Sequence, residues 1–522
     1  MHKRAPGQLS TRARRWAALT GLVGGVVGLG LSNLIAWLTG PAGSPVSAVG
    51  EVVIGLLPAP LVNFGKDTLG LADKPILLAI ITVAVLALCA LAGVVEYRRR
   101  LAGGAVFAVV AVLGLVGVAA RAGGQVTAYV PTVVGLVFGY IVLQTLVEKL
   151  HLWQDGRPAG GAPAEAASPA RRSFLRWTAV AGGLAAIGAV AGQVLVDAAN
   201  RVSDVRDRLR LPAAAKPAPP VPAAAELSVP GLSPYLTPND DFYRIDTALQ
   251  VPVIDPGDWS LEISGMVENP ITITYDELAA LPLVEHVATL TCVSNEVGGG
   301  LVGNATWLGY PIRELLARAR PTAGADMVLS TSQDDFSAGT PLEALTDPDR
   351  QALLALGMNG QPLPLEHGFP VRMVVPGLYG YVSATKWVRK MKVTTFAADQ
   401  GYWTPLGWSA RGPVKLASRI DVPGSSVDAG QVAVAGVAWA QHVGVSKVEV
   451  QVDEGPWQQA ELAEVTSTDT WRQWRFVWDA AKGDHTLTVR ATDTAGTLQV
   501  AAQAAPAPDG STGYHSVSVT VR

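Results

Sequence analysis

The chain has 522 residues, of which 49% are hydrophobic and only 16% charged, and its mean hydropathy is +0.29. Soluble proteins carry about a quarter charged residues, so this composition indicates a membrane protein. Residues 1–210 hold 20 basic and 10 acidic side chains, whereas residues 211–522 hold 20 and 33. The pattern argues against disorder and against a nucleic-acid binder, and it predicts a membrane anchor followed by a large soluble part.

Five uncharged runs are long enough to cross a hydrocarbon core of about 30 Å, which takes about 20 helical residues. They are Trp16–Leu38, Ile76–Val95, Leu101–Ala120, Ala122–Val147 and Trp177–Val196. Segment 46–65 is also apolar, but Glu51 and two prolines interrupt it, so we interpret it as interfacial or re-entrant. Lysine and arginine precede the first, third and fifth runs, which places those loops in the cytoplasm. With five spans, the residues after Val196 are expected outside the cytoplasm.

The runs contain no histidine, aspartate, glutamate, lysine or arginine, which excludes a bis-histidine haem and favours a passive anchor. The sequence RRSFLR at 171–176, before the fifth run, resembles a twin-arginine export signal. Alternatively, the arginine pair only obeys the positive-inside rule. We favour the export signal, because Phe174, Leu175 and a further basic residue follow the arginine pair. That route moves folded domains, which suits a domain that takes up a cofactor before crossing.

The soluble part begins with a segment rich in proline and alanine, Leu211–Pro234, which is expected to be an extended tether of roughly 60–70 Å at about 3.1 Å per residue. Alternation predicts a strand at 259–265, and periodicity predicts helices at 275–281 and 312–319. From about Val422 onward, short alternating strands at 432–439, 447–452, 474–478 and 485–490 predict a β-sandwich. The predicted domains are a membrane region (1–200), a linker (201–234), a mixed α and β domain (235–420) and an all-β sandwich (421–522).

The chain has two cysteines, Cys89 in an apolar run and Cys292 in the soluble part. Two cysteines exclude a disulfide framework and a cysteine-rich metal site. Cys292 follows an apolar stretch and precedes a glycine-rich segment that would let the backbone approach a bulky group. The residues leave three roles open: a buried structural thiol, a nucleophile with His286 or His367 as its base, or a ligand to a metal that a cofactor holds.

Six motifs over residues 236–522 together resemble the molybdopterin-binding oxidoreductases of the sulfite oxidase family. They are TPNDDFY (237–243), TLTCVSN (289–295), NATW (304–307), MNGQPLP (358–364), HGFPVRMVVPG (367–377) and YGYVSATKW (379–387). The resemblance implies that Cys292 ligates the molybdenum of a molybdopterin cofactor. It also implies that the central domain is α+β and that the C-terminal domain is an immunoglobulin-like sandwich through which two chains could pair.

The resemblance assigns seven further residues to the cofactor. They are Asn239 and Tyr243 at the pterin, His367 and Arg372 at the pterin and its phosphate, Thr385 and Lys386 in a loop over the phosphate, and Thr331 at the end of a strand. Two cations on either side of an apolar run are explained more economically by a bound anion than by surface pairing.

Departures from the family pattern limit the prediction of the substrate. Residues 294–297 lack the arginine of sulfite-oxidising members, and the loop 439–444 lacks a second arginine. Residues 294–297 also contain Glu296, and a carboxylate near the metal would repel sulfite. We therefore predict a neutral or organic substrate, such as an S- or N-oxide, in preference to sulfite. No haem domain is evident, so a separate electron carrier is required. The prediction is a multi-pass membrane enzyme with an extracytoplasmic catalytic domain; the alternative is a cofactor-free extracytoplasmic binding or adhesion protein.

Overall fold

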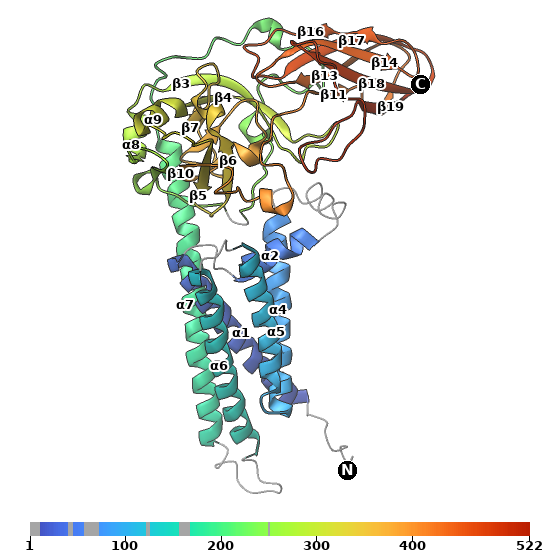
Figure 1. The fold of residues 1–522 in the computed structure, drawn as a ribbon. Helices are drawn as coiled ribbons and strands as arrows, with labels where there is room; N and C mark the ends of the chain where they lie inside the picture. Colours follow the sequence, from blue (N-terminus) through green and yellow to red (C-terminus); the bar gives the residue numbers. More distant parts are fainter. Residues whose placement is uncertain (1–10, 40–44, 57–72, 122–125, 156–167, 249–250) are drawn as a thin grey trace. The chain divides into compact units, whose positions relative to one another are not determined.

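The structure, a computed structural model, describes residues 11–39, 45–56, 73–121, 126–155, 168–248 and 251–522. The chain divides into two compact units. Unit 1 comprises Met1–Asn200 with Thr247–Gln250, and unit 2 comprises Arg201–Asp246 with Val251–Arg522. Among the described residues, unit 1 is helical, whereas unit 2 combines sheets, short helices and long connecting segments (Figure 1).

Unit 1 contains the apolar helices. They are α1 (Thr11–Thr39), α2 (Pro45–Leu56), α4 (Asp73–Arg98), α5 (Ala102–Arg121), the short η3 (Val126–Tyr129), α6 (Val130–Asp155) and α7 (Ser168–Arg208), whose end lies in unit 2. Within the described residues, four segments are long and apolar enough to cross a membrane: Thr11–Ala36, Ile76–Arg98, Ala102–Ala119 and Val130–Gln154.

Four spans are one fewer than the sequence predicts. The fifth predicted span, Trp177–Val196, falls inside the 41-residue helix α7, where the side chains of residues 184–200 lie outside the described part. The segment predicted as interfacial, 46–65, forms helix α2 as far as Leu56, and its remainder also lies outside the described residues.

Small residues let the helices of unit 1 approach closely. A Cβ atom on Gly21 of α1 would overlap the carbonyl of Cys89 on α4, and one on Gly93 of α4 would overlap the carbonyl of Ala17. A Cβ atom on Gly135 of α6 would overlap the hydroxyl of Ser32 and the carbonyl of Gly28 on α1. In a membrane, helices associate through such close packing because lipid gives them no hydrophobic driving force.

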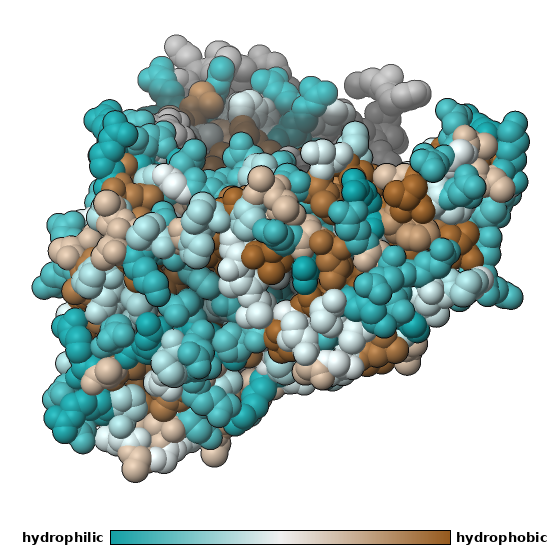
Figure 2. Space-filling model, turned by 90° about the horizontal axis from the view of Figure 1, so that it is seen from above, coloured by the Kyte–Doolittle hydropathy of each residue, from teal (hydrophilic) through white to brown (hydrophobic). Residues whose placement is uncertain are grey.

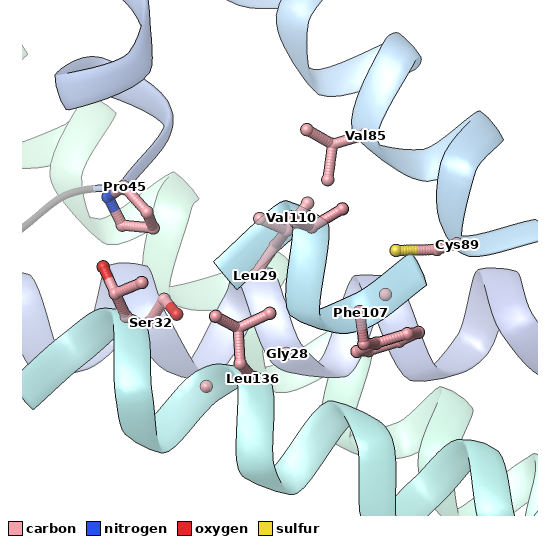
Figure 3. Close-up of a pocket in the computed structure, with 12 residues that line it drawn as sticks. Gly28, Leu29, Ser32, Pro45, Val85, Cys89, Phe107, Val110 and Leu136 are labelled. Carbon is pink, nitrogen blue, oxygen red and sulfur yellow. The ribbon is translucent and has the colours of Figure 1, made fainter. Parts of the chain in front are cut away.

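A small cavity of about 40 Å³ remains inside this bundle. Val85, Cys89, Phe107 and Leu136 surround it (Figure 3). Cys89 is 3% exposed, so its thiol is a buried apolar group of the anchor.

The central part of unit 2 is built on two five-stranded sheets. One has the order β2 (Ile271–Thr274), β1 (Ser260–Gly265), β10 (Val388–Thr394), β5 (Met327–Ser332) and β6 (Ser337–Pro341). The other has the order β3 (Val284–Thr291), β4 (Val302–Pro311), β7 (Leu353–Met358) and β8 (Gln361–Pro362), with β9 (Arg372–Val374) also paired to β7. The pair β1 and β10 is parallel, and the other pairs are antiparallel.

Three short α-helices complete this domain: α8 (Tyr275–Ala279), α9 (Ile312–Ala319) and α10 (Leu342–Thr346). Helix α8 begins with a capping box between Thr274 and Glu277. The predicted helices at 275–281 and 312–319 and the strand at 259–265 are therefore confirmed within one or two residues. Mixed sheets and short helices make the domain α+β, as the resemblance implies.

The C-terminal domain is a two-sheet sandwich. One sheet has the order β11 (Ala417–Val422), β13 (Gly430–Trp439), β17 (Arg472–Ala480) and β16 (Glu461–Leu462). The other has β12 (Ser426–Val427), β19 (His515–Val521), β18 (Gly483–Asp493), β14 (Val445–Val452) and β15 (Gln458–Gln459). The four strands predicted from alternation lie within β13, β14, β17 and β18, and Trp474 and Trp478 fill the space between the sheets.

The face of unit 2 in Figure 2 is largely hydrophilic, with apolar residues only in small patches.

The segment Leu211–Pro234 is not a free tether, and this prediction was wrong. Ala215 N donates to Leu283 O at 2.8 Å, and Leu227 N donates to Gln473 Oε1 at 2.7 Å. These partners belong to the central domain and to the sandwich, so the segment packs along both. Apart from the short turn η4 (Ala223–Ala225) and the turns that follow it, the segment is extended, so many of its backbone groups are free to bond to the surfaces it lies against.

Candidate active site

Cys292 lies directly after β3, at the start of a loop that two backbone hydrogen bonds hold closed. Cys292 N donates to Leu301 O at 2.9 Å, and Asn295 N donates to Cys292 O at 3.1 Å. The side chain of Asn295 accepts a third bond, from Leu301 N at 2.7 Å. Cys292 is not disulfide-bonded and is 8% exposed. The sequence therefore places a single buried thiol at a rigidly closed turn, and we call residues 292–301 the Cys292 loop.

Two tyrosines lie near this thiol. Burial raises the pKa of Tyr243; the Cys292 thiolate adds to that shift, and Arg372 opposes it. Burial also raises the pKa of Tyr379 to about 12, with a smaller contribution from the Cys292 thiolate. Both phenols therefore stay protonated at neutral pH.

Three basic side chains, His367, Arg372 and Lys386, form a cluster. His367 closes the short turn η7 (Leu365–His367) and is 2% exposed, and Arg372 on β9 is 4% exposed. Arg372 donates to His367 O at 3.1 Å, and its guanidinium lies 5.1 Å from the centroid of the Trp307 ring. Gly368 has φ +109°, and a Cβ there would press on Arg372 and Lys386, so only glycine allows the three segments to meet.

Lys386 is the third member of the cluster and is 9% exposed. Its Nζ donates to Asp246 Oδ2 at 2.8 Å and to Glu366 O at 2.9 Å. Arg244 Nε donates to the same oxygen of Asp246 at 3.1 Å. The structure thus brings Arg372, Lys386 and His367 together, as predicted, and adds Arg244 and Asp246, which the sequence analysis missed although they directly follow the TPNDDFY motif.

The charges of this cluster do not cancel. Arg244, Arg372 and Lys386 are cations. In the described part of the chain, Asp246 pairs with Arg244 and Lys386, so these four side chains carry a net +2. The described hydrogen bonds of Arg372 all go to backbone carbonyls. Burial lowers the pKa of Arg372 to about 10 and that of Lys386 to about 8. Burial and the two neighbouring cations lower the pKa of His367 to about 3, so this histidine is neutral.

Excess positive charge at the buried Arg372 and Lys386 side chains is costly unless an anion compensates it. A phosphate dianion has the matching charge, and arginine and lysine are its usual protein partners. The cluster therefore has the chemistry of a buried phosphate site.

The remaining predicted residues are Asn239, Thr385 and Thr331. Asn239 in η5 (Asn239–Asp241) accepts a hydrogen bond from Asn359 Nδ2 at 2.9 Å. Thr385 is fully buried, and its hydroxyl lies 2.7 Å from that of Ser330 on β5. Thr331 follows Ser330 on the same strand, so its side chain points to the opposite face of the sheet. The structure therefore brings Ser330, and not Thr331, beside Thr385.

The structure also changes the argument about the substrate. Glu296 is exposed to solvent, so its carboxylate is not aimed at the thiol, and our argument that it repels sulfite loses its basis. In the loop 439–444, Gln441 is 3% exposed and donates to Thr291 Oγ1 at 2.6 Å. Its Oε1 atom has no partner among the described residues. A neutral amide therefore lies next to the residue that precedes Cys292.

Next to Gln441, an acid bridges two histidines. Asp469 accepts from His286 Nε2 at 2.7 Å and lies 3.1 Å from His442 Nδ1. Burial alone would raise the pKa of Asp469, but these bonds outweigh it and hold the pKa at about 2. His286, an open candidate for a catalytic base, is thus engaged by Asp469 at the seam between the central domain and the sandwich.

Comparisons with known proteins agree with this site. Residues 248–403 match the oxidoreductase molybdopterin binding domain family, and residues 420–489 match a bacterial Ig domain. Mitochondrial sulfite oxidase of Rattus norvegicus is 31% identical over 272 residues, which cover 44% of this chain and 49% of the relative. The enzyme of Drosophila melanogaster is 30% identical over 353 residues, which cover 56% and 60%.

Among solved structures, the sulfane dehydrogenase SoxCD of Paracoccus pantotrophus superposes with a TM-score of 0.48 at 22% identity, covering 55% of this chain and 82% of that one. The chain spans about half the length of the curated relatives it matches.

The central domain is thus a molybdopterin-binding oxidoreductase domain, and the C-terminal domain that follows it is Ig-like. More particularly, this part of the chain is similar to the mitochondrial sulfite oxidases, which agrees with the resemblance found in the sequence. The same matches imply molybdenum–molybdopterin as its cofactor. The residues present fit that group, since the buried cluster with net +2 suits its phosphate and Cys292 offers a thiolate.

Proposed function

We propose that the chain is a membrane-anchored enzyme that transfers an oxygen atom to or from a small molecule, with Cys292 as the protein ligand of molybdenum. The observation that carries the proposal is the link between the buried thiol and the buried cations. A Cβ on Gly380 would lie 3.9 Å from Thr291 O, beside Cys292, and 3.6 Å from the Cβ of Ala384. Ala384 O in turn accepts from Arg372 Nη2 at 3.5 Å, so the thiol and the cations lie on neighbouring segments. A hydrolase would need a base at the thiol, whereas His286 lies six residues before Cys292 along β3, roughly 20 Å away at about 3.3 Å per residue.

Each side chain then has a defined task. Arg244, Arg372 and Lys386 would hold the phosphate, and Asn239 and Tyr243 would hold the pterin. When bound, the cofactor supplies a two-electron redox couple and a site for the transferred oxygen. Cys292, buried and held in a closed loop, supplies a soft thiolate at a fixed position.

The substrate is proposed to be neutral, an S- or N-oxide in preference to sulfite. Two features of this chain support that choice. Residues 294–297 contain no arginine, and the loop 439–444 presents the amide of Gln441 next to Thr291. The nearby cation Arg350 is compensated, since its guanidinium lies 3.9 Å from the carboxylate of Asp347 and donates to Pro376 O. An anionic substrate would find no uncompensated cation on these segments.

We further propose that the catalytic domain is extracytoplasmic, receives or delivers electrons through a separate carrier, and pairs with a second copy through the Ig-like domain. Twin-arginine export remains a proposal that rests on Arg171 and Arg172, which are exposed. Phe174 of the same motif packs at the bundle, with its ring centroid 5.5 Å from that of Trp153. Replacing both arginines by lysine keeps the charge, so unchanged protease accessibility of unit 2 from outside would show that the pair acts only through charge.

Metal analysis tests the proposal as a whole. Full-length protein from a host that makes molybdopterin should contain about one molybdenum per chain and should turn over an S- or N-oxide with a reduced dye. Protein without molybdenum from such a host would contradict the proposal and favour the cofactor-free binding protein. Turnover of sulfite alone would keep the enzyme and overturn the choice of substrate.

A further inference from the structure

The Ig-like domain reaches the Cys292 loop through its long β18–β19 connection. Ser511 Oγ in this connection donates to Asn295 O at 2.7 Å. Asn295 is the residue whose N–H and side chain close the Cys292 loop, so the bond from Ser511 acts at the closing point. The connection therefore contacts the Cys292 loop at Asn295, the residue whose hydrogen bonds close it.

Two further contacts from the same domain support the loop beyond Asn295. Arg419 Nη1 on β11 donates to Gly299 O at 2.9 Å. A Cβ on Gly298 would overlap the imidazole of His515, so that ring lies directly on the loop backbone. A glycine-rich loop has much conformational entropy to lose, and contacts from outside restrict it.

The same connection also confines the phenol of Tyr379. A Cβ on Gly510 would overlap the Tyr379 hydroxyl, and Gly510 has φ +102°. Lys415 N donates to that hydroxyl at 3.3 Å, while its Nζ donates to Asp509 Oδ1 and Gly510 O, both at 2.8 Å. Tyr379 is 4% exposed. Its phenol is therefore held between the central domain and the connection.

We propose that residues 509–511 of the Ig-like domain complete the active site, Ser511 as a positioning residue for the Cys292 loop and Gly510 as a positioning residue for Tyr379. The Ig-like domain then has a task within its own chain, apart from any pairing of two chains. The inference rests on the proposed function for the meaning of Cys292 as a ligand, but the contacts can be tested without the cofactor.

The test measures alkylation of Cys292 by iodoacetamide in full-length, cofactor-free protein carrying Cys89→Ser. Ser511→Ala is expected to speed alkylation about fivefold, which corresponds to about 1 kcal/mol of lost loop closure at 1.4 kcal/mol per tenfold. Thr512→Ala is the matched control, because Thr512 Oγ1 donates to Ala502 O at 2.7 Å inside the same connection. Ser511→Thr keeps the hydroxyl and should restore the slow rate.

A second pair of variants tests Gly510. Gly510→Ala should speed alkylation by displacing Tyr379, whereas Gly496→Ala should not. Gly496 lies in the same connection at φ +87° with open space around it, so it carries the same backbone strain without a neighbour. Equal rates in Ser511→Ala and Thr512→Ala, or in the two glycine variants, would overturn the proposal.

In protein from the cofactor-making host, Ser511→Ala should keep its molybdenum but show a changed sulfur coordination by X-ray absorption. Unchanged coordination would count against the positioning of Cys292. Absence of molybdenum from the wild type would refute the proposed function alone, because the alkylation result does not depend on the metal.

Discussion

Lys386→Ala tests the phosphate site most sharply, because the charges around it can be counted. The substitution lowers the net charge of Arg244, Arg372, Lys386 and Asp246 from +2 to +1 and leaves a buried dianion undercompensated. Breaking a buried, hydrogen-bonded pair costs about 3–5 kcal/mol. At 1.4 kcal/mol per tenfold, cofactor retention should fall by roughly a hundredfold to several thousandfold.

The assay is molybdenum and pterin content per folded chain after dialysis. Lys390→Ala is the matched control, since Lys390 lies four residues further along the chain and is exposed; it should retain the cofactor. Adding Asp246→Asn to Lys386→Ala returns the net charge to +2 and should recover part of the retention. Wild-type occupancy in Lys386→Ala, or no effect of the second substitution, would refute the charge argument.

Three other predictions concern Cys292, Asp469 and Gly21. Cys292→Ser should keep the fold but lose activity, because a hydroxyl is a harder and weaker ligand, whereas Cys89→Ser should be nearly silent; full activity of the first variant would remove the ligand assignment. Asp469 has a folded pKa of about 2, below its unfolded value, so it contributes stability above about pH 4 that is lost as the pH falls toward 2. Asp469→Asn should therefore cost about 2 kcal/mol at neutral pH and flatten the acid side of the stability profile, measured by thermal unfolding. Gly21→Val should lower detergent-solubilised yield and thermal stability, because its side chain would overlap the backbone at Cys89; wild-type stability would contradict the packing.

Local patterns were enough to predict much of this chain from its sequence. Period-two alternation located β13, β14, β17 and β18, and an apolar face at helical spacing located α9 at its observed bounds. The TPNDDFY and HGFPVRMVVPG motifs identified His367 and Arg372 as neighbours of one site, although 124 residues separate Tyr243 from His367. These successes share a cause, since strand alternation, helix periodicity and a family's motifs are all properties of short segments.

Only the tertiary structure showed which distant residues each segment contacts. The composition of Leu211–Pro234 is that of a free extended chain, and nothing local indicates that Leu283 and Gln473 accept its backbone. The pairing of Asp246 with Lys386 joins residues 140 apart, and the bond from Ser511 to Asn295 joins residues 216 apart. The sequence determined which residue types were available and the local form of each segment. Which charges are compensated, and which connection of the Ig-like domain contacts the Cys292 loop, depend on the packing of distant surfaces, because burial and long-range contact exist only in the folded chain.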